Sequence, residues 1–259
     1  MKELDLDRVS QFIDENFVDF YHSLINALEE LTLNQLLEIK NPYLFKVNCV
    51  FSVSELLENL LDAYLSSSEE KLFGDFLENL AIFIAGQTCG GHKSTAQGVD
   101  LEFIHNDIHY VVSIKSGPNW GNSSQVKKLV QDLKSAVIRV QQSRTANAVR
   151  PVLGICYGKT RTNVNYRLPG CWKVVGQNFW YLISENESLY TDIIEPIGYR
   201  ARQHNEAFDS ERGRVVNRFT REFIDRFCDP LGGIDWPRLV AFNSGNYDLD
   251  EIMTLCNPT

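Results

Sequence analysis

The chain has no long apolar run and no paired cysteines, and these absences narrow what it can be. No stretch of the 259 residues approaches the ~18 consecutive apolar residues of a membrane-spanning helix. The first ten residues, MKELDLDRVS, lack the apolar segment of a secretory signal. The six cysteines are scattered without a CxxC pair, which favours reduced thiols in a cytoplasmic protein over a disulfide framework or a zinc site.

Positive charge is scarce overall but concentrated in the middle of the chain. The net charge of −9 by itself argues against a nucleic-acid partner. Residues 1–78 carry 16 acids and 5 bases, residues 79–175 carry 4 acids and 12 bases, and residues 176–259 carry 14 acids and 8 bases. A local basic surface matters more for phosphate contact than whole-chain charge, so the middle part predicts a DNA-facing surface. The alternative is a helix face that is merely solvated.

Residues 98–119, GVDLEFIHNDIHYVVSIKSGPN, predict a β-hairpin. Apolar and polar residues alternate on both sides of an Asn-Asp dipeptide at 106–107, and both residue types tolerate the positive φ of a two-residue turn. Paired residue numbers then sum to 213, which places Asp100 opposite Ser113 and brings Lys115 onto the same face. A carboxylate beside a lysine can hold a hard cation and activate a water molecule.

The flanking segments indicate an α/β fold. Apolar spacing predicts helices over 5–39, 53–65, 69–86, 124–142 and 210–228, with serines 66–68 joining the second to the third. Pro151 opens a short buried strand, VLGICY, and a strand or short helix is expected around 172–183. A hairpin, a crossover helix and a further strand make a mixed central β-sheet flanked by helices, with helical decorations at both ends.

Three regions are expected within one continuous globular domain. Residues 1–68 would be a helical region packed on the core, and residues 69–175 would form the core itself. Residues 176–259 would be a mostly helical part, including a C-terminal helical piece, available for DNA recognition and dimerisation.

The hairpin carries a family resemblance. An Asp on one strand, followed on the next by Asp, Glu or Ser, any residue and then Lys, resembles the PD-(D/E)XK nuclease superfamily, and Asp100 with Ser113-Ile114-Lys115 fits that pattern. The segments SGPN at 116–119 and NSSQ at 122–125 are similar to type II restriction endonucleases that carry a K-(S/A)-G-P-N loop. The resemblance covers roughly residues 69–157, and Val99 stands where the family has a Pro.

The resemblance implies a type II restriction endonuclease that hydrolyses phosphodiester bonds in duplex DNA at a specific short site. Its cofactor would be Mg²⁺, with Mn²⁺ as a substitute. Asp100 would bind the metal, and Lys115 would position the attacking water or stabilise the transition state. Cutting both strands of a palindromic site favours a homodimer. We expect no membrane association, and a cognate DNA methyltransferase in the same cell as the functional partner.

Ser113 counts among the candidate catalytic residues by its place in the triplet, but it stands where the family has an acid. A second metal-binding carboxylate must therefore come from elsewhere. Glu102 lies on the same hairpin face as Asp100. Glu78 lies on the helix before the hairpin, where related endonucleases carry an accessory Glu. Asp132 is the only acid of the following helix. We expect Glu78 or Glu102 in this role ahead of Asp132.

Two groups of polar residues are candidates for DNA contact. The first follows the hairpin and consists of Asn119, Asn122, Ser123, Gln125, Lys127 and Lys128. Helix N-termini bind anions, although the same amides and hydroxyls can simply build the turn and the helix cap. The second lies in an arginine-rich segment and consists of Arg200, Arg202, Arg212 and Arg214. Arginine reads guanine in the major groove, but on a helix with interleaved acids it can equally form surface ion pairs.

Two other functions remain open on the sequence. One is a repair or recombination nuclease of the same superfamily. The other is a catalytically silent DNA-binding or interaction module that keeps the fold, and Ser113 in the acidic position favours that alternative.

Overall fold

The computed structural model describes residues 1–245 and Met253, except 49, 51 and 144–147, with the backbone alone for residues 200–205. The chain divides into two compact units. The sheet unit comprises Met1–Ser23 and Glu69–Asn205, and the helical unit comprises Leu24–Ser68 and Glu206–Thr259. In the described residues no helix is both long and apolar enough to cross a membrane.

The sheet unit contains the expected mixed sheet, which confirms the α/β prediction. Five strands lie in chain order: β1 (His92–Lys93), β2 (Leu101–His105), β3 (Ile108–Lys115), β4 (Ala148–Ile155) and β5 (Trp172–Val175). The pairs β1–β2 and β2–β3 are antiparallel, whereas β3, β4 and β5 run parallel to one another. A parallel pair needs a crossover, and α5 (Ser123–Ser143) provides the one between β3 and β4.

The β2–β3 hairpin has the predicted register. Leu101 pairs with Val112 and His105 with Ile108, so paired numbers sum to 213. The turn residues Asn106 and Asp107 have φ values of 50° and 58°, the left-handed conformation that a two-residue turn of this kind requires. Asp100 extends the ladder by one bond, because its N–H donates to the Val112 carbonyl at 2.9 Å.

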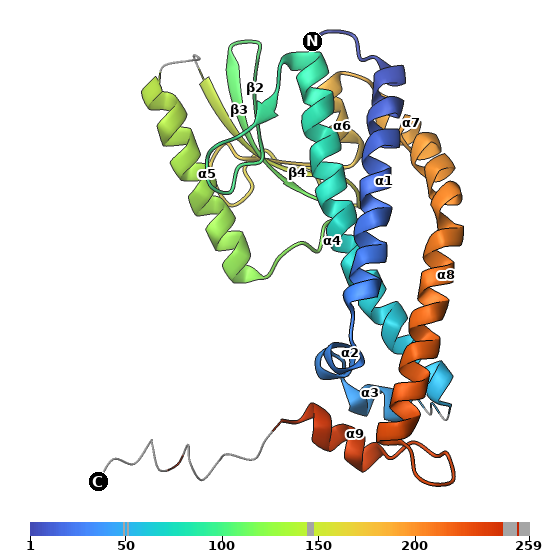
Figure 1. Ribbon diagram of the computed structural model, residues 1–259. Coiled ribbons are helices and arrows are strands. Elements are labelled where there is room, and N and C mark those ends of the chain that lie inside the picture. Colours follow the sequence, from blue (N-terminus) through green and yellow to red (C-terminus); the bar gives the residue numbers. More distant parts are fainter. Residues whose placement is uncertain (49, 51, 144–147, 246–252, 254–259) are drawn as a thin grey trace. The chain divides into compact units, whose positions relative to one another are not determined.

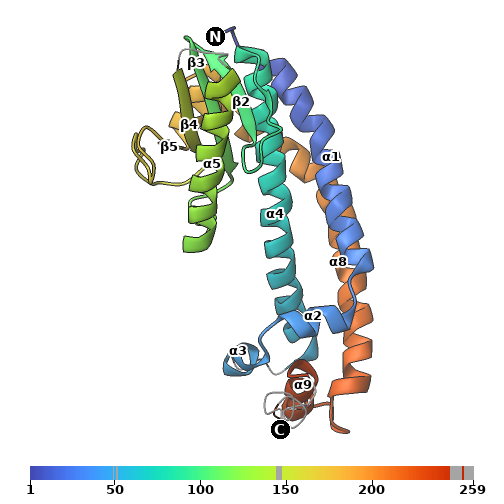
Figure 2. The same ribbon diagram turned by 90° about the vertical axis from the view of Figure 1, so that its left-hand side faces the viewer.

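One face of the sheet is covered by α5 (Figures 1 and 2). The buried side of this helix packs on odd-numbered residues of β3 and β4 in one apolar cluster, which includes Leu129, Leu133, Ala136, Val140, Val111, Leu153 and Ile155. On the other side of the sheet lies the end of α4 (Val53–Cys89), with α1 (Leu6–Glu30) beside it (Figure 1). Phe12 of α1 stacks on Phe83 of α4 with ring centroids 4.2 Å apart.

After β5 the chain forms α6 (Gln177–Ser184), α7 (Leu189–Asp192) and α8 (Ile194–Phe227). Phe179 of α6 lies so close to Gly154 of β4 that a Cβ at that position would overlap its ring. Position 154 therefore requires glycine for α6 to pack on the sheet.

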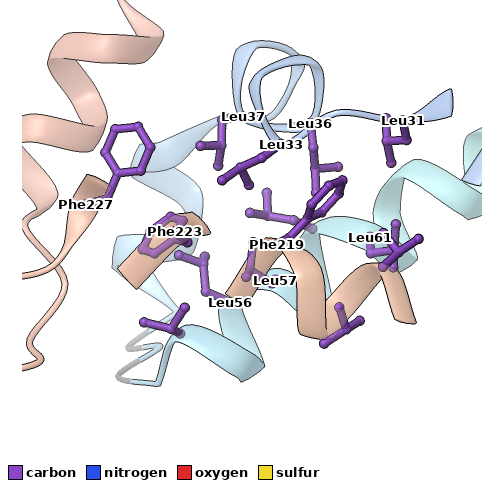
Figure 3. Close-up of a cluster of buried hydrophobic side chains, with 14 of the residues drawn as sticks. Leu31, Leu33, Leu36, Leu37, Leu56, Leu57, Leu61, Phe219, Phe223 and Phe227 are labelled. Atoms are coloured by element: carbon purple, nitrogen blue, oxygen red, sulfur yellow. The ribbon is translucent and has the colours of Figure 1, made fainter. Parts of the chain in front are cut away.

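The helical unit has its own core. It contains α2 (Leu33–Ile39), α3 (Pro42–Val47) and α9 (Trp236–Asn243), together with parts of α1, α4 and α8. Leu31 and the leucines of α2 and α4 pack against phenylalanines of α8 (Figure 3). The labelled residues are Leu31, Leu33, Leu36, Leu37, Leu56, Leu57, Leu61, Phe219, Phe223 and Phe227.

Three expected helix boundaries were wrong. The helix predicted over 210–228 begins much earlier in the chain, because α8 spans Ile194–Phe227. The helix predicted over 5–39 is interrupted, because Thr32 forms a reciprocal capping box with Gln35 and starts α2 anew. The break predicted at serines 66–68 does not occur, and α4 continues through it. Ser67 and Ser68 donate their hydroxyl protons to the carbonyls of Ala63 and Tyr64 one turn earlier, so they are satisfied within the helix.

Candidate active site

Asp100, Ser113 and Lys115 converge at one end of the β2–β3 hairpin, as the register predicts. Asp100 Oδ2 accepts a hydrogen bond from the Ile114 N–H at 2.6 Å and one from Ser113 Oγ at 3.3 Å. These donors anchor one oxygen of the carboxylate. The other oxygen, Oδ1, has no hydrogen-bond partner among the described residues. The anchored carboxylate therefore presents an open oxygen.

The Lys115 ammonium lies beside the same carboxylate. Its Nζ is 3.7 Å from Asp100 Oδ2 and donates a hydrogen bond to the Ile114 carbonyl at 2.7 Å. The ring of Trp120 lies on another side, with its centroid 5.9 Å from Nζ. The lysine is thus held in place at the end of its strand while its side chain remains 30% exposed.

Glu78 of α4 is electrostatically coupled to this pair. Burial raises the pKa of the Glu78 carboxyl above its ordinary value, and the negative charge of Asp100 raises it further. Lys93, whose Nζ is 3.6 Å from Glu78 Oε1, and Lys115 act in the opposite direction without reversing the shift. The Glu78 carboxyl is therefore close enough to Asp100 and Lys115 for their charges to affect its pKa.

The loop after Lys115 is held against β4 and α4. The backbone N–H groups of Cys156 and Tyr157 donate to the carbonyls of Lys115 and Ser116. The Tyr157 ring lies over Gly117, where a Cβ would overlap it. The backbone of the SGPN segment is therefore held by β-type hydrogen bonds, and a side chain at position 117 would displace the Tyr157 ring.

The next residues build the start of α5. Asn122 Oδ1 accepts from the N–H groups of Ser124 and Gln125, and Gln125 Oε1 accepts from the Asn122 N–H at 2.8 Å. Asn122 and Gln125 therefore form a capping box, the structural alternative considered for them above. Asn119 and Ser123 are exposed.

The same helix start borders an open hollow of about 510 Å³. Asn122 and Ser123 line it together with two cations, Lys127 and Arg167. Lys128 is also exposed on α5. All three cations belong to the basic middle part of the sequence.

Glu102 is placed differently from the other acids. It is 6% exposed, and donors occupy both of its oxygens. Ser94 Oγ and Arg139 donate to Oε1, each at 2.5 Å, and His109 Nε2 lies 2.9 Å from Oε2. The structure does not bring this carboxylate together with that of Asp100, although the two residues share a face of the hairpin.

Asp132 of α5 approaches the chain just before Asp100. A Cβ at Gly98 would overlap the Asp132 side chain, and Gly98 has a φ of 71°. The acid therefore packs on a glycine backbone. No contact joins it to Asp100 among the described residues.

The arginine-rich segment lies in α8. Arg212 donates to Asp62 Oδ1 at 2.6 Å, and Arg214 pairs with Glu211 at 3.2 Å. Both therefore make the ion pairs that were the alternative to DNA contact. The side chains of Arg200 and Arg202 lie outside the described residues, so their predicted role is a hypothesis that rests on the sequence.

Three residues at the site are not among those the sequence singled out. Lys93 of β1 comes near Glu78 only through the packing of α4 on the sheet. Trp120 and Tyr157 contact the site through their rings, next to Lys115 and over Gly117. Of these residues, only Trp120 could have been noticed in the sequence, because it follows the SGP segment by two positions.

The described residues hold no cluster of three or more His, Cys, Asp or Glu side chains with the spacing of a metal site. Mg²⁺, however, is commonly held by one or two carboxylates with waters and substrate phosphates completing the shell. The open Oδ1 of Asp100 and the coupled carboxyl of Glu78 fit that requirement.

Comparison with known proteins agrees with this geometry. The family model described as "Type II restriction endonuclease EcoO109I" matches residues 7–205, which is most of the chain and includes every strand and the residues around Asp100. No curated protein gives a significant match. From the extent of the family match and the converging Asp100, Ser113 and Lys115, the chain belongs to the EcoO109I family of type II restriction endonucleases.

Proposed function

We propose that the chain is a Mg²⁺-dependent type II restriction endonuclease that cuts duplex DNA at a short specific site. One observation carries the proposal. Oδ2 of Asp100 accepts hydrogen bonds from Ile114 and Ser113 and lies 3.7 Å from the Lys115 ammonium. The other carboxylate oxygen, Oδ1, has no partner in the described residues. A family of DNA-cutting enzymes supplies the substrate class.

Asp100 and Glu78 would hold the metal ion. When bound there, Mg²⁺ would polarise the scissile phosphate and lower the pKa of a water molecule. The raised pKa of Glu78 favours its protonated form, and that proton must leave before the group can act as an anionic ligand.

Lys115 would act on the reacting phosphate. Its ammonium is oriented by the Ile114 carbonyl and by Asp100, so it can donate to the attacking water or to an oxygen that gains negative charge. Orientation before the reaction matters because the group then needs no rearrangement as the charge develops.

Cleavage of duplex DNA also requires a second active site and contacts to the DNA backbone. The described residues provide one such site per chain, and cutting both strands of a palindrome requires two, so we infer a homodimer. Lys127, Lys128 and Arg167 would contact backbone phosphates. A DNA methyltransferase in the same cytoplasm would protect the host's own sites.

A catalytically silent DNA-binding module is the second candidate. The serine at 113 and the lack of a three-residue cluster in the described residues favour it. Incubation of the purified chain with a plasmid of known sequence over a range of Mg²⁺ concentrations separates the candidates. Discrete fragments support the proposal, a smear indicates a repair-type nuclease, and intact plasmid with retained DNA binding indicates the silent module.

A further inference from the structure

We propose that Glu102 is a positioning residue: with Ser94, His109 and Arg139 it forms a buried network that sets the place of Asp100. This inference rests on the proposed function of the Asp100 site and gives Glu102 a role other than metal binding. It is carried by contacts from three separate parts of the sheet unit to a single carboxylate.

The network draws the elements around the site together. Glu102 lies on β2, His109 on β3, Arg139 on α5 and Ser94 in the connection after β1. Each of the three partners donates to the Glu102 carboxylate, at 2.5 Å from Ser94 and Arg139 and 2.9 Å from His109. One acid therefore fastens two strands, a connection and the helix that covers them.

Ser94 links this carboxylate to Asp100. The Ser94 hydroxyl donates to Glu102, while the Ser94 N–H donates to the main-chain carbonyl of Asp100 at 3.1 Å. The hydroxyl oxygen also accepts from the Ala96 N–H at 2.9 Å, and the Ala96 carbonyl accepts from the Val99 N–H at 3.2 Å. The connection that presents Asp100 is therefore fixed from Ser94 to Val99.

Burial makes the contacts of this network depend on one another. Glu102 is only 6% exposed, and Ser94, His109 and Arg139 all donate to its carboxylate. The carboxylate is therefore bonded to protein donors in a site from which most water is excluded. Removing its charge would leave buried donors without an acceptor, which is unfavourable unless the surrounding segments move.

Both oxygens of Glu102 are occupied, whereas Oδ1 of Asp100 is open within the described residues. A metal ion at Glu102 would have to displace Arg139, a cation, from Oε1. If Glu102 bound the metal ion, Arg139 and the metal would compete for its carboxylate, so removal of Arg139 would strengthen metal binding.

The test compares Glu102→Gln and Arg139→Met with Glu187→Gln, which removes one exposed charge of the same unit outside the network. Two quantities are measured for each protein: the Mg²⁺ concentration that gives half-maximal plasmid cleavage, and the affinity of the protein alone for Mn²⁺ from its electron paramagnetic resonance signal. Melting temperatures are recorded, and assays are run well below them so that a purely structural loss does not move either quantity.

A positioning role predicts that Glu102→Gln and Arg139→Met both weaken Mn²⁺ binding and raise the Mg²⁺ requirement by about 10-fold or more, the usual effect of losing a group that orients a metal ligand. Arg139→Lys should recover most of the loss, and Glu187→Gln should match the wild type. If Glu102 were itself a ligand, Arg139→Met would instead tighten Mn²⁺ binding by removing a competing cation, and that result overturns the inference.

Arg139 is 44% exposed in its side chain, so its variants test the network even where Glu102→Gln fails to fold. Wild-type metal requirements in both network variants would also overturn the inference while the proposed function stands. If the wild type binds Mn²⁺ through Asp100 but never cuts DNA, the proposed function fails. The Mn²⁺ affinities of the Glu102 and Arg139 variants then still show whether the network positions Asp100. If it neither binds Mn²⁺ nor cuts, both fail.

Discussion

Ser113 Oγ donates a hydrogen bond to Asp100 Oδ2 across the hairpin, at 3.3 Å. A second carboxylate at this buried position would repel Asp100 until a cation screened the two charges. The serine removes that repulsion and turns the position from a ligand into an anchor. The site therefore keeps its geometry through hydrogen bonds, and we propose that Glu78 of α4 supplies the second acid.

Lys115→Ala should reduce cleavage by about 10³-fold, the scale of losing one preorganised charge-stabilising donor. Binding of the specific DNA should change little, because the lysine acts on charge that develops only in the transition state. Single-turnover cleavage and a DNA-binding titration without Mg²⁺ measure the two effects. Wild-type rates in the variant would remove Lys115 from the catalytic residues.

The identity of the second acid can be decided by four single substitutions. Glu78→Ala should cost about 10³-fold or more in rate, as expected for loss of a principal charge. Ser113→Ala should cost far less, because it removes only one hydrogen bond to Asp100. Asp132→Ala should leave the chemistry largely intact, and Glu102→Ala should act through the Mg²⁺ requirement. A fully active Glu78→Ala together with an inactive Asp132→Ala would move the role to α5.

Glu78 should also set the pH dependence. Its pKa is raised, so the group binds protons more readily in the folded chain than in the unfolded chain. Its contribution to stability therefore falls as pH rises from the ordinary Glu value to the raised one. Over the same window the Mg²⁺ requirement should fall, because the deprotonated carboxylate is the ligand. The measurement is the cleavage rate at a fixed Mg²⁺ concentration across this pH window, for the wild type and for Glu78→Gln. The rate should rise with pH in the wild type, and this rise should be absent in Glu78→Gln.

DNA affinity should fall steeply with salt despite the acidic composition. Each phosphate contact contributes about 0.9 to the log–log slope. A Lys127→Ala/Lys128→Ala variant should have a shallower slope. Lys2→Ala/Lys71→Ala removes two exposed charges elsewhere in the sheet unit and should keep the wild-type slope. Equal slopes in all three proteins would mean that the start of α5 does not face DNA.

The hairpin could be predicted because its rules are local. Alternation and the Asn106-Asp107 turn fix the register, and the register alone brings Asp100, Ser113 and Lys115 together. The surroundings of Glu102 could not be predicted in this way. Strand alternation gives the face on which it lies, but its partner Arg139 is 37 residues away and reaches it only when α5 packs on the sheet.

The helix boundaries likewise separate into those that local sequence determines and those that it does not. Serines often end helices, yet Ser67 and Ser68 bond to carbonyls within α4, and nothing in the local sequence distinguishes the two outcomes. Glu78 illustrates the intermediate case. Its place on the preceding helix was available from the resemblance, but its coupling to Asp100 and Lys93 depends on how that helix packs.

Asp100→Asn tests the central claim most directly, because the substitution keeps the size of the side chain and removes only the charge that a hard cation prefers. The measurement is plasmid cleavage by wild type and variant over a range of Mg²⁺ concentrations, with Mn²⁺ binding to each protein alone. The account predicts discrete fragments from the wild type, and both weakened Mn²⁺ binding and no fragments from the variant. Unchanged cleavage and Mn²⁺ affinity in Asp100→Asn would contradict it, because the metal would then be held elsewhere.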